Sequence, residues 1–267
     1  MSAVLAIGLV QLFGCSSDEA LQQLSPKDRF DLAMQKFKSE DYLDAEKDFR
    51  VVTLQFQGTA FSDDAQYYLG ECRFMREEYI LAAYEYDLLI RSMPLSEFVA
   101  RARFKKAMCY YNLSPAPYRD QDYTKKAIDE LQGFLEYFPS DTLAPDAAQK
   151  IQELINKLGE KEYNNGLMYM RMEYYKAAVF CFDVVLEKYH YTPFADQAQL
   201  KKSEALLRRK RFIEAKTEIE RFFEKYPKSQ HLAEAETLRR EIVTKLSEGS
   251  EGSSKSPVMP PSPVKQY

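Results

Sequence analysis

The 267-residue sequence contains no tryptophan, only two histidines and only nine glycines. Scarce glycine argues against a β-rich fold, because tight hairpin turns depend on it. Two histidines are too few for a multi-histidine zinc site, and no nucleophile-elbow, zinc-protease or phosphate-loop motif occurs. The lack of tryptophan also disfavours a glycan-binding protein, which would use its rings as stacking platforms. We therefore expect no enzyme, no cofactor and no metal site.

Charge and hydrophobicity set further limits on the class of protein. The 37 basic and 41 acidic residues are interspersed and leave a net charge of −4. Such a chain has no basic face for nucleic acid. Hydrophobic residues make up 45% of the sequence, which is enough for a folded core. No run of about eighteen consecutive apolar residues occurs, so we expect no stable transmembrane helix.

A short apolar segment at the N-terminus resembles a processing signal. Residues 3–14, AVLAIGLVQLFG, have the length of a signal-peptide core. They end in Leu12, Phe13, Gly14 and Cys15, the order of a bacterial lipobox, in which the cysteine thiol is acylated and the chain is cut before it. We predict a signal peptide at 1–14, lipid attachment at Cys15 and a tether at 15–25. The alternative is an apolar N-terminus with an incidental cysteine.

An internal repeat runs through the rest of the chain. An aromatic residue, an alanine three positions later and an apolar residue four further on recur, and one weaker copy begins at a threonine. The alanines are Ala45, Ala82, Ala127, Ala178 and Ala215, and a second small residue precedes each of them, at Ala33, Gly70, Ala107, Gly166 and Ser203. Small residues let two helices approach closely where they cross. The pattern therefore predicts five packed helix pairs of the tetratricopeptide kind.

Proline marks the boundaries between several of these pairs. Pro94, Pro139 and Pro227 each follow an alanine by twelve residues, and proline cannot continue a helix. We expect an all-α fold, a right-handed superhelix of five tetratricopeptide-repeat helix pairs plus a C-terminal capping helix, which a solenoid needs at its end. The domain covers 26–247, and a disordered Ser/Gly/Pro-rich tail follows at 248–267. The expected helices lie near 26–38, 41–56, 61–76, 79–92, 96–112, 122–138, 142–171, 174–189, 194–209, 212–226 and 229–247.

Three cysteines fall inside the expected helices. Cys72, Cys109 and Cys181 lack zinc-type pairing, and we expect them to be buried as small apolar residues. Cys72 and Cys109 occupy equivalent positions in consecutive repeats. Helices pack about 8–10 Å apart, whereas a disulfide needs Cα atoms within about 7 Å, so no disulfide is expected between them.

The lipobox and the five repeats together resemble the BamD (YfiO/ComL) family of outer-membrane-protein assembly lipoproteins. The resemblance covers residues 12–247. It rests most on the insertion RDQ at 119–121 within the third helix pair, FPSDTLAPDAAQKI at 138–151, LGEKEYNNGLMYMRMEYYKAA at 158–178 and KYHYTPFADQA at 188–198.

The resemblance implies a lipid-anchored subunit of the barrel-assembly (BAM) complex at the outer membrane, facing the periplasm. It implies that the repeats at 26–140 bind C-terminal targeting segments of unfolded outer-membrane proteins, and that those at 141–247 dock on BamA. Other barrel-assembly subunits are further expected partners. The alternative is a generic cell-envelope tetratricopeptide lipoprotein that scaffolds a peptidoglycan or division complex. The RDQ insertion and the long helix at 142–171 favour the first interpretation.

A peptide-binding groove is expected along the first helices of the first three pairs. Its positions lie three before, one after and four after each small residue: Phe30, Met34 and Phe37; Tyr67, Glu71 and Phe74; Phe104, Met108 and Tyr111. Aromatic residues and methionine suit varied apolar side chains. Arg101 and Lys105 share a helical face and would attract a terminal carboxylate. For each aromatic residue, the alternative is packing within the core.

A basic run joins the helices of the fifth pair. It consists of Arg208, Arg209, Lys210 and Arg211. One interpretation is a contact with an acidic patch of a partner protein. The other is a solvated turn, in which the C-terminal end of the preceding helix favours cations.

Overall fold

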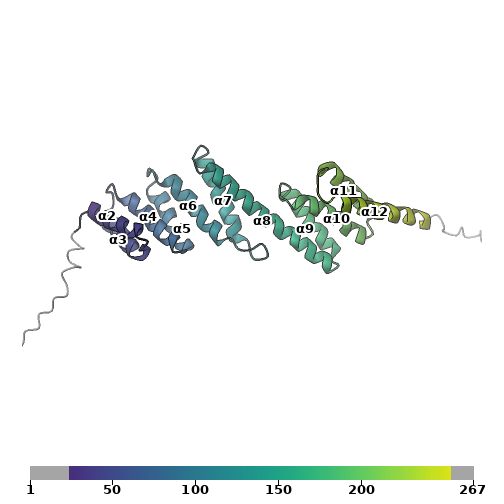
Figure 1. Cartoon of the computed structure of the whole chain (residues 1–267), viewed down its shortest axis with the longest axis horizontal. Helices are drawn as coiled ribbons and strands as arrows, with labels where there is room; N and C mark the ends of the chain where they lie inside the picture. Colours follow the sequence, from purple (N-terminus) through teal and green to yellow (C-terminus); the bar gives the residue numbers. More distant parts are fainter. Residues whose placement is uncertain (1–23, 254–267) are drawn as a thin grey trace, which may run out of the picture. The chain divides into compact units, whose positions relative to one another are not determined.

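The computed structural model describes residues 24–253. This part of the chain is entirely helical and contains no strand. Figure 1 labels the helices in chain order. They are α2 (Pro26–Lys38), α3 (Tyr42–Gln55), α4 (Ser62–Met75), α5 (Tyr79–Ser92), α6 (Val99–Leu113), α7 (Asp122–Tyr137), α8 (Ala144–Arg171), α9 (Tyr175–Lys188), α10 (Ala195–Arg208), α11 (Phe212–Lys225) and α12 (Leu232–Ser253). The predicted all-α fold is confirmed for these residues.

Three helices begin two or three residues later than the sequence predicts, and the turns before them explain the delay. Each turn follows a proline by two residues and carries a side-chain oxygen. The amide of Phe98 donates to Oγ of Ser96 at 3.1 Å, and that of Leu143 donates to Oδ1 of Asp141 at 2.8 Å. The amide of His231 likewise donates to Oγ of Ser229 at 3.1 Å. A side chain that satisfies a backbone amide in this way holds a turn open before the helix starts.

The chain divides into two compact units. Unit 1 contains residues up to 113 together with 129–147, and unit 2 contains 114–128 and the residues from 148 onward. Two of the three boundaries fall inside helices α7 and α8, and the third lies at the end of α6. The functional division at residues 140 and 141 remains a prediction.

Small residues bring paired helices into close contact, as the repeat predicts. In unit 1, Ala33 and Ala45 are fully buried in one core cluster that includes Phe49 and Leu69. In unit 2, Ala178 lies in a cluster with Phe182, and Ala215 in one with Ile219. At Gly70 the ring of Tyr86 occupies the space that a side chain would need. The alanines and the small residues therefore act as crossing points.

The turns between paired helices share a left-handed residue that is not glycine. Glu40, Glu77, Glu173 and Lys210 have φ values between 59° and 64°. In the turn at Glu40, the amide of Asp41 donates to the carbonyl oxygen of Lys36 at 3.0 Å, and the other three turns repeat this bond. This closure is that of a Schellman motif, which satisfies carbonyls left open at a helix end.

The last helix is longer than predicted. α12 continues to Ser253, whereas the sequence pattern placed its end at 247 and assigned 248–267 to a disordered tail. The assignment is wrong for residues 248–253. Lys245 and Glu248 form an ion pair of 2.8 Å one turn apart, and such pairs contribute to the continuation of a helix. Among the described helices, none combines the length and hydrophobicity needed to cross a membrane.

Candidate peptide groove and docking surface

The expected groove positions in unit 1 are mostly half-buried. Phe30 packs against Phe61 and Phe49, with ring centroids 5.5 and 5.7 Å apart, and Phe37 packs against Tyr42 and Tyr68. Phe74 contacts Tyr79 edge-on at 5.4 Å. These rings therefore hold neighbouring helices together and remain partly exposed. The half-buried members of the predicted set are Phe30, Met34, Phe37, Glu71, Phe74, Lys105, Met108 and Tyr111.

Two predicted groove residues are packing residues instead. Tyr67 is buried and stacks on Phe98 with a centroid distance of 4.7 Å. Phe104 is buried against Phe134 at 5.6 Å. Both partners come from segments that follow in the chain, so the register of one helix does not reveal them. The expectation that Tyr67 and Phe104 face the groove is corrected: both lie in the packed interior.

The two predicted cations have different environments. Nζ of Lys105 lies 2.9 Å from a carboxylate oxygen of Glu71 and 4.6 Å from the centroid of the Phe74 ring. Glu71 also accepts a hydrogen bond from the hydroxyl of Tyr86, and burial together with Glu71 raises the pKa of Tyr86 well above its ordinary value. Arg101 is exposed and forms no ion pair with another described residue. Arg101 is therefore the cation that is available to an incoming anion.

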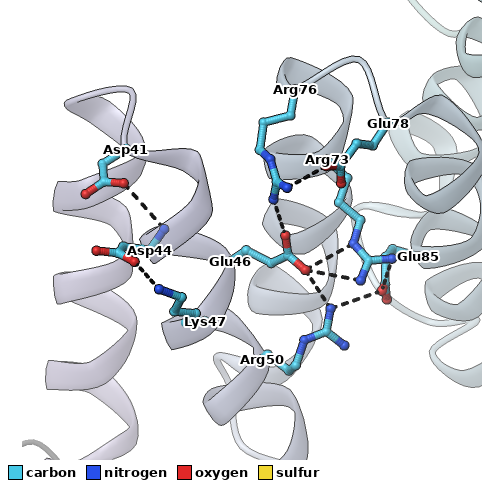
Figure 2. A network of polar contacts seen from close by, with 9 residues as sticks. All are labelled: Asp41, Asp44, Glu46, Lys47, Arg50, Arg73, Arg76, Glu78 and Glu85. Atoms are coloured by element: carbon cyan, nitrogen blue, oxygen red, sulfur yellow. Dashed lines mark hydrogen bonds and ion pairs between the residues drawn. The ribbon is translucent and has the colours of Figure 1, made fainter. Parts of the chain in front are cut away.

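On the opposite side of α4, a polar network joins α3, α4 and α5. Figure 2 shows Glu46 at its centre. Carboxylate oxygens of Glu46 lie 2.7 Å from Arg50, 3.1 Å from Arg73 and 2.6 Å from Arg76. Burial would raise the pKa of Glu46, but the hydrogen bonds and charges of Arg50 and Arg73 outweigh it and hold that pKa below its ordinary value. The charges are thus satisfied within the network.

A buried polar contact recurs across the helix pairs, and the sequence analysis did not find it. Its first residue lies four before the small residue, and its second lies three after the alanine. Arg29 meets Asp48 at 2.7 Å in the first pair. Gln66 donates to Glu85 at 2.9 Å in the second, and Gln199 donates to Glu218 at 2.7 Å in the fifth. The register of the repeat, read for polar as well as apolar positions, would have revealed it.

The RDQ insertion is held by hydrogen bonds within unit 2. Gln121 is buried, and its amide nitrogen donates to the carbonyl oxygens of Ala116 at 2.8 Å and Arg119 at 3.1 Å. From α8, Lys161 donates to the carbonyl of Arg119 at 2.7 Å, and Lys157 donates to Oγ of Ser114 at 2.7 Å. These contacts give the long helix a specific role, because its lysines fix the insertion.

The basic turn in unit 2 lies beside exposed aromatic residues. The side chain of Arg208 is 48% exposed. Its guanidinium nitrogens lie 3.9 Å from Glu204 and 3.7 Å from Glu241, so both ion pairs are long. Arg211 pairs with Glu214, and Lys210 has the left-handed φ of 59°. Arg209 lines a shallow hollow together with Tyr174, Tyr175, Lys176 and Phe180. The surface therefore offers apolar rings next to a cluster of cations.

The three described cysteines are free and buried, as predicted. Burial raises the pKa of the Cys72 and Cys109 thiols to about 12 and that of Cys181 to about 11. Such thiols stay protonated and unreactive at neutral pH. The signal peptide, the lipobox with Cys15 and most of the tether lie outside the described residues. Within the described part, no group of three or more potential ligands could hold a metal ion.

Comparison with known proteins assigns the family. The model of the YfiO family, described as outer membrane lipoprotein, matches residues 22–198. The chain belongs to this family. The resemblance to BamD lipoproteins inferred from the sequence is therefore confirmed.

Curated proteins similar to this YfiO-family chain carry the name outer membrane protein assembly factor BamD. The protein from Caulobacter vibrioides is 28% identical over 159 residues, which are 60% of this chain and 52% of that protein. The protein from Rickettsia prowazekii is 26% identical over 194 residues, 72% of this chain and 77% of that protein. The chain thus matches about half the length of the first relative and about three quarters of the second. Neither name describes an enzyme, in agreement with the expectation from the sequence.

Solved structures similar to the YfiO-family chain include two tetratricopeptide-repeat proteins. The TPR2AB domain of yeast Sti1, in its pHSP90 complex, is 14% identical, with a TM-score of 0.42, over 86% of this chain and 93% of that chain. A thermophilic TPR protein from Thermus thermophilus is 16% identical, with a TM-score of 0.36, over 83% and 99% of the two chains. No functional inference follows from similarity at this level.

Proposed function

We propose that this chain is a scaffold subunit of the machinery that assembles β-barrel proteins in the outer membrane. The observation that carries the proposal is the family match over residues 22–198, together with curated relatives that are named as assembly factors. In this proposal the protein is anchored by acyl chains on Cys15 and faces the periplasm. Several acyl chains hold a protein stably on a membrane where one does not.

The groove of unit 1 is the proposed site for the C-terminal segments of unfolded outer-membrane proteins. Its half-buried rings and methionines offer adaptable apolar contacts, which varied sequences need. Arg101 supplies the exposed cation for a terminal carboxylate, and Lys105, which is paired with Glu71, is the weaker candidate. The bound segment would place its last aromatic side chain between Phe74 and Met108 and its carboxylate at Arg101.

The basic turn of unit 2 is the proposed docking surface for BamA. Arg208, Arg209, Lys210 and Arg211 would meet acidic side chains, and the hollow with Tyr174 and Phe180 would receive an apolar one. Aromatic residues and arginine are the residue types that contribute most to protein interfaces. Both features lie within unit 2, so the proposal needs no contact between the units.

Purification from detergent-solubilised envelopes, with mass spectrometry of the copurifying proteins, tests the proposal. Recovery of BamA and unfolded barrel proteins is the expected result. Peptidoglycan or division enzymes without BamA would overturn it and leave a generic envelope scaffold. Incorporation of labelled palmitate into the wild type, but not into Cys15→Ser, tests the anchor separately.

Two charge reversals test which proposed surface binds barrel proteins and which binds BamA. Arg101→Glu should lower the recovery of barrel proteins and leave BamA unchanged, whereas Arg209→Glu should do the opposite. Arg91→Glu is the control, because Arg91 is an exposed arginine on α5 that belongs to neither proposed surface and forms an ion pair with Asp87 of the same helix. A synthetic peptide that ends in phenylalanine should bind the wild type more tightly as the free acid than as the amide. Equal binding of acid and amide would contradict the role of Arg101.

A further inference from the structure

A second groove in unit 1 follows helix α4 and is bounded by helices α3 and α5. Side chains of Ser62, Gln66, Leu69, Arg73 and Arg76 line it. They recur every three or four residues and so share the face of α4 that forms its floor. Its walls come from α3 and α5. One end opens into a cleft of about 900 Å³. The rest of the groove is a hollow lined by Arg73 and Arg76. Arg50 and Leu54 line both this hollow and the cleft, so the two are continuous.

The walls of this α3/α5 groove expose large apolar side chains. On α3, Leu43 and Leu54 are 53% and 67% exposed, and on α5, Leu81 and Tyr84 are 48% and 56% exposed. Leu95, in the turn after α5, is 99% exposed. Scattered apolar residues on a surface are ordinary, but rows on two facing helices form a contiguous patch of the kind that marks a binding surface.

The exposed apolar wall positions of this groove have polar counterparts in unit 2, although the backbone repeats, whereas Lys47 of the groove has the exposed Phe180 as its counterpart. Helices α3, α4 and α5 begin at Tyr42, Ser62 and Tyr79, and α9, α10 and α11 begin at Tyr175, Ala195 and Phe212, so the second set follows the first at a constant offset. All six helices have 14 residues, and the left-handed residues Glu40 and Glu77 match Glu173 and Lys210 at the same offset. The helix lengths and the turns therefore give the two segments a common register.

Comparison at this offset shows that the fold does not require the apolar walls. Leu43, Leu54, Leu81, Tyr84, Leu88 and Leu95 correspond to Lys176, Glu187, Glu214, Thr217, Arg221 and Lys228. All six polar counterparts are exposed. Since exposed polar residues serve equally well at these positions in unit 2, the apolar ones in unit 1 need another reason, and a partner surface supplies it.

The charges in the floor leave nothing for a charged partner to neutralise. Glu46 is shared by Arg50, Arg73 and Arg76, as Figure 2 shows. Glu85 lies 3.0 Å from Arg73, and Glu78 pairs with Arg76. A charged group inserted here would lose hydration without gaining an unpaired counter-charge. Asp63, which lines the cleft at one end, forms no ion pair with another described residue, but the stretch between Leu54 and Leu81 complements an uncharged face.

We propose that the α3/α5 groove binds an amphipathic helix of a partner protein, which inserts an uncharged, leucine-type stripe between Leu54 and Leu81. A helix satisfies its own backbone hydrogen bonds, whereas an extended segment needs donors and acceptors from the groove. Gln66, Arg73 and Arg76 of the floor are already engaged with the carboxylates of Glu46, Glu78 and Glu85. Only Oγ of Ser62, among the described side chains that line the groove, is buried without a hydrogen-bond partner.

The dimensions of the groove suit a helix of about four turns. The wall helices α3 and α5 each have 14 residues. A helix of this size is about 21 Å long, because each residue adds about 1.5 Å. On α3 the residues that line the groove include Leu43, Lys47, Arg50 and Leu54, which follow one face at one-turn intervals. A docked helix would meet them with apolar side chains at i, i+4, i+7 and i+11. This surface is separate from the proposed substrate groove and from the basic turn.

A designed peptide tests the proposal with the full chain. The probe is a stapled 16-residue helix of leucine, alanine and glutamine, with leucine at i, i+4, i+7 and i+11, and binding is measured by fluorescence anisotropy. Saturable binding is expected, and Leu54→Glu or Leu81→Glu should each weaken it at least tenfold. Both variants introduce the residues that unit 2 carries at the same positions, Glu187 and Glu214, so they should fold normally, as circular dichroism will check.

Three controls make the outcome decisive. Ile213→Glu, at an apolar residue of α11 that is 75% exposed, should leave binding unchanged. A scrambled peptide of the same composition should not bind, and neither should a proline-containing version that cannot form the helix. Equal weakening by Ile213→Glu, equal binding of either control peptide or no binding at all would each overturn the proposal. Dimerisation that Leu54→Glu abolishes, without peptide binding, would overturn it too and assign the groove to a second copy of the chain.

Discussion

The ring of Tyr86 lies directly over Gly70, so that a Cβ built on this glycine would be 2.6 Å from Cε1 of the ring. Glycine inside a helix normally costs about 1 kcal/mol relative to alanine. Here the ring is fully buried and fixed by a hydrogen bond to Glu71, so it cannot move aside without disturbing the core. Gly70→Ala should therefore destabilise the protein by about 1–3 kcal/mol, as overpacking does.

A second glycine provides the matched control for this prediction. Gly133 lies within α7, and a Cβ there would meet no atom within 4 Å. Gly133→Ala should stabilise the protein by up to about 1 kcal/mol, because only the helix propensity changes. Urea unfolding followed by circular dichroism measures both variants. The same sign for both substitutions would show that Tyr86 does not set the requirement for glycine.

The left-handed turn residues predict a stabilising substitution. Glu40 has a φ of 64°, a conformation that costs an ordinary residue about 1 kcal/mol and glycine almost nothing. Glu40→Gly should therefore raise the free energy of unfolding by several tenths to about 1 kcal/mol. Lys38→Gly, inside the last turn of α2, should lower it instead. Denaturant midpoints of the two variants measured side by side would reveal these opposite effects, and a loss of stability in Glu40→Gly would contradict the observed turn.

The buried contact between Gln66 and Glu85 predicts a specific loss of stability. The amide nitrogen of Gln66 donates to both the carbonyl oxygen and the carboxylate of Glu85, at 3.0 and 2.9 Å. Gln66→Leu keeps a similar shape but removes the donor, and an acceptor buried without it costs about 1–3 kcal/mol. Gln35→Leu, on an exposed position of α2, should change stability by less than about 0.5 kcal/mol. Equal effects of the two variants in urea unfolding would show that the buried contact contributes nothing.

Much of the helical framework could be predicted because the repeat is encoded locally. Small residues, alanines and prolines at fixed spacing specify each crossing and each turn, and the helices begin and end within three residues of their predicted positions, apart from the end of α12. The delays at Val99 and Leu232 follow from serine side chains that cap backbone amides, which a hydrophobic pattern does not record.

The candidate site was less predictable because exposure depends on neighbouring elements. Tyr67 and Phe74 occupy related positions on α4, yet Phe98 stacks on Tyr67 whereas Lys105 lies over the ring of Phe74. The α3/α5 groove was missed for a related reason: its leucines lie on the second helices of the pairs, which the repeat pattern assigns to packing. Aligning the two repeat segments at their constant offset would have shown, from the sequence alone, that the position of Leu54 corresponds to Glu187.

The depressed pKa of Glu46 predicts how the network responds to acid. Its neighbours hold the folded-state pKa below the ordinary value of 4.5. Stability from this carboxylate is therefore fully present above about pH 4.5 and is lost as the pH falls through the lower folded-state pKa. At pH 7, Glu46→Gln should lower the denaturant midpoint, because three arginines lose their shared anion. The difference from the wild type should shrink as the pH falls below about 4.5 toward the lower folded-state pKa, because the wild-type carboxylate is then progressively protonated.

A matched substitution separates this effect from general acid sensitivity. Glu224 is exposed on α11, and Glu224→Gln should give a small difference from the wild type that does not change in the same way with pH. Urea midpoints of the three proteins at pH 7, 5, 4 and 3 make the comparison. A constant gap between the wild type and Glu46→Gln across this range would mean that the network does not stabilise the ionised carboxylate. A narrowing gap would show that the charge of Glu46 stabilises the contact between α3 and α4 through the arginines.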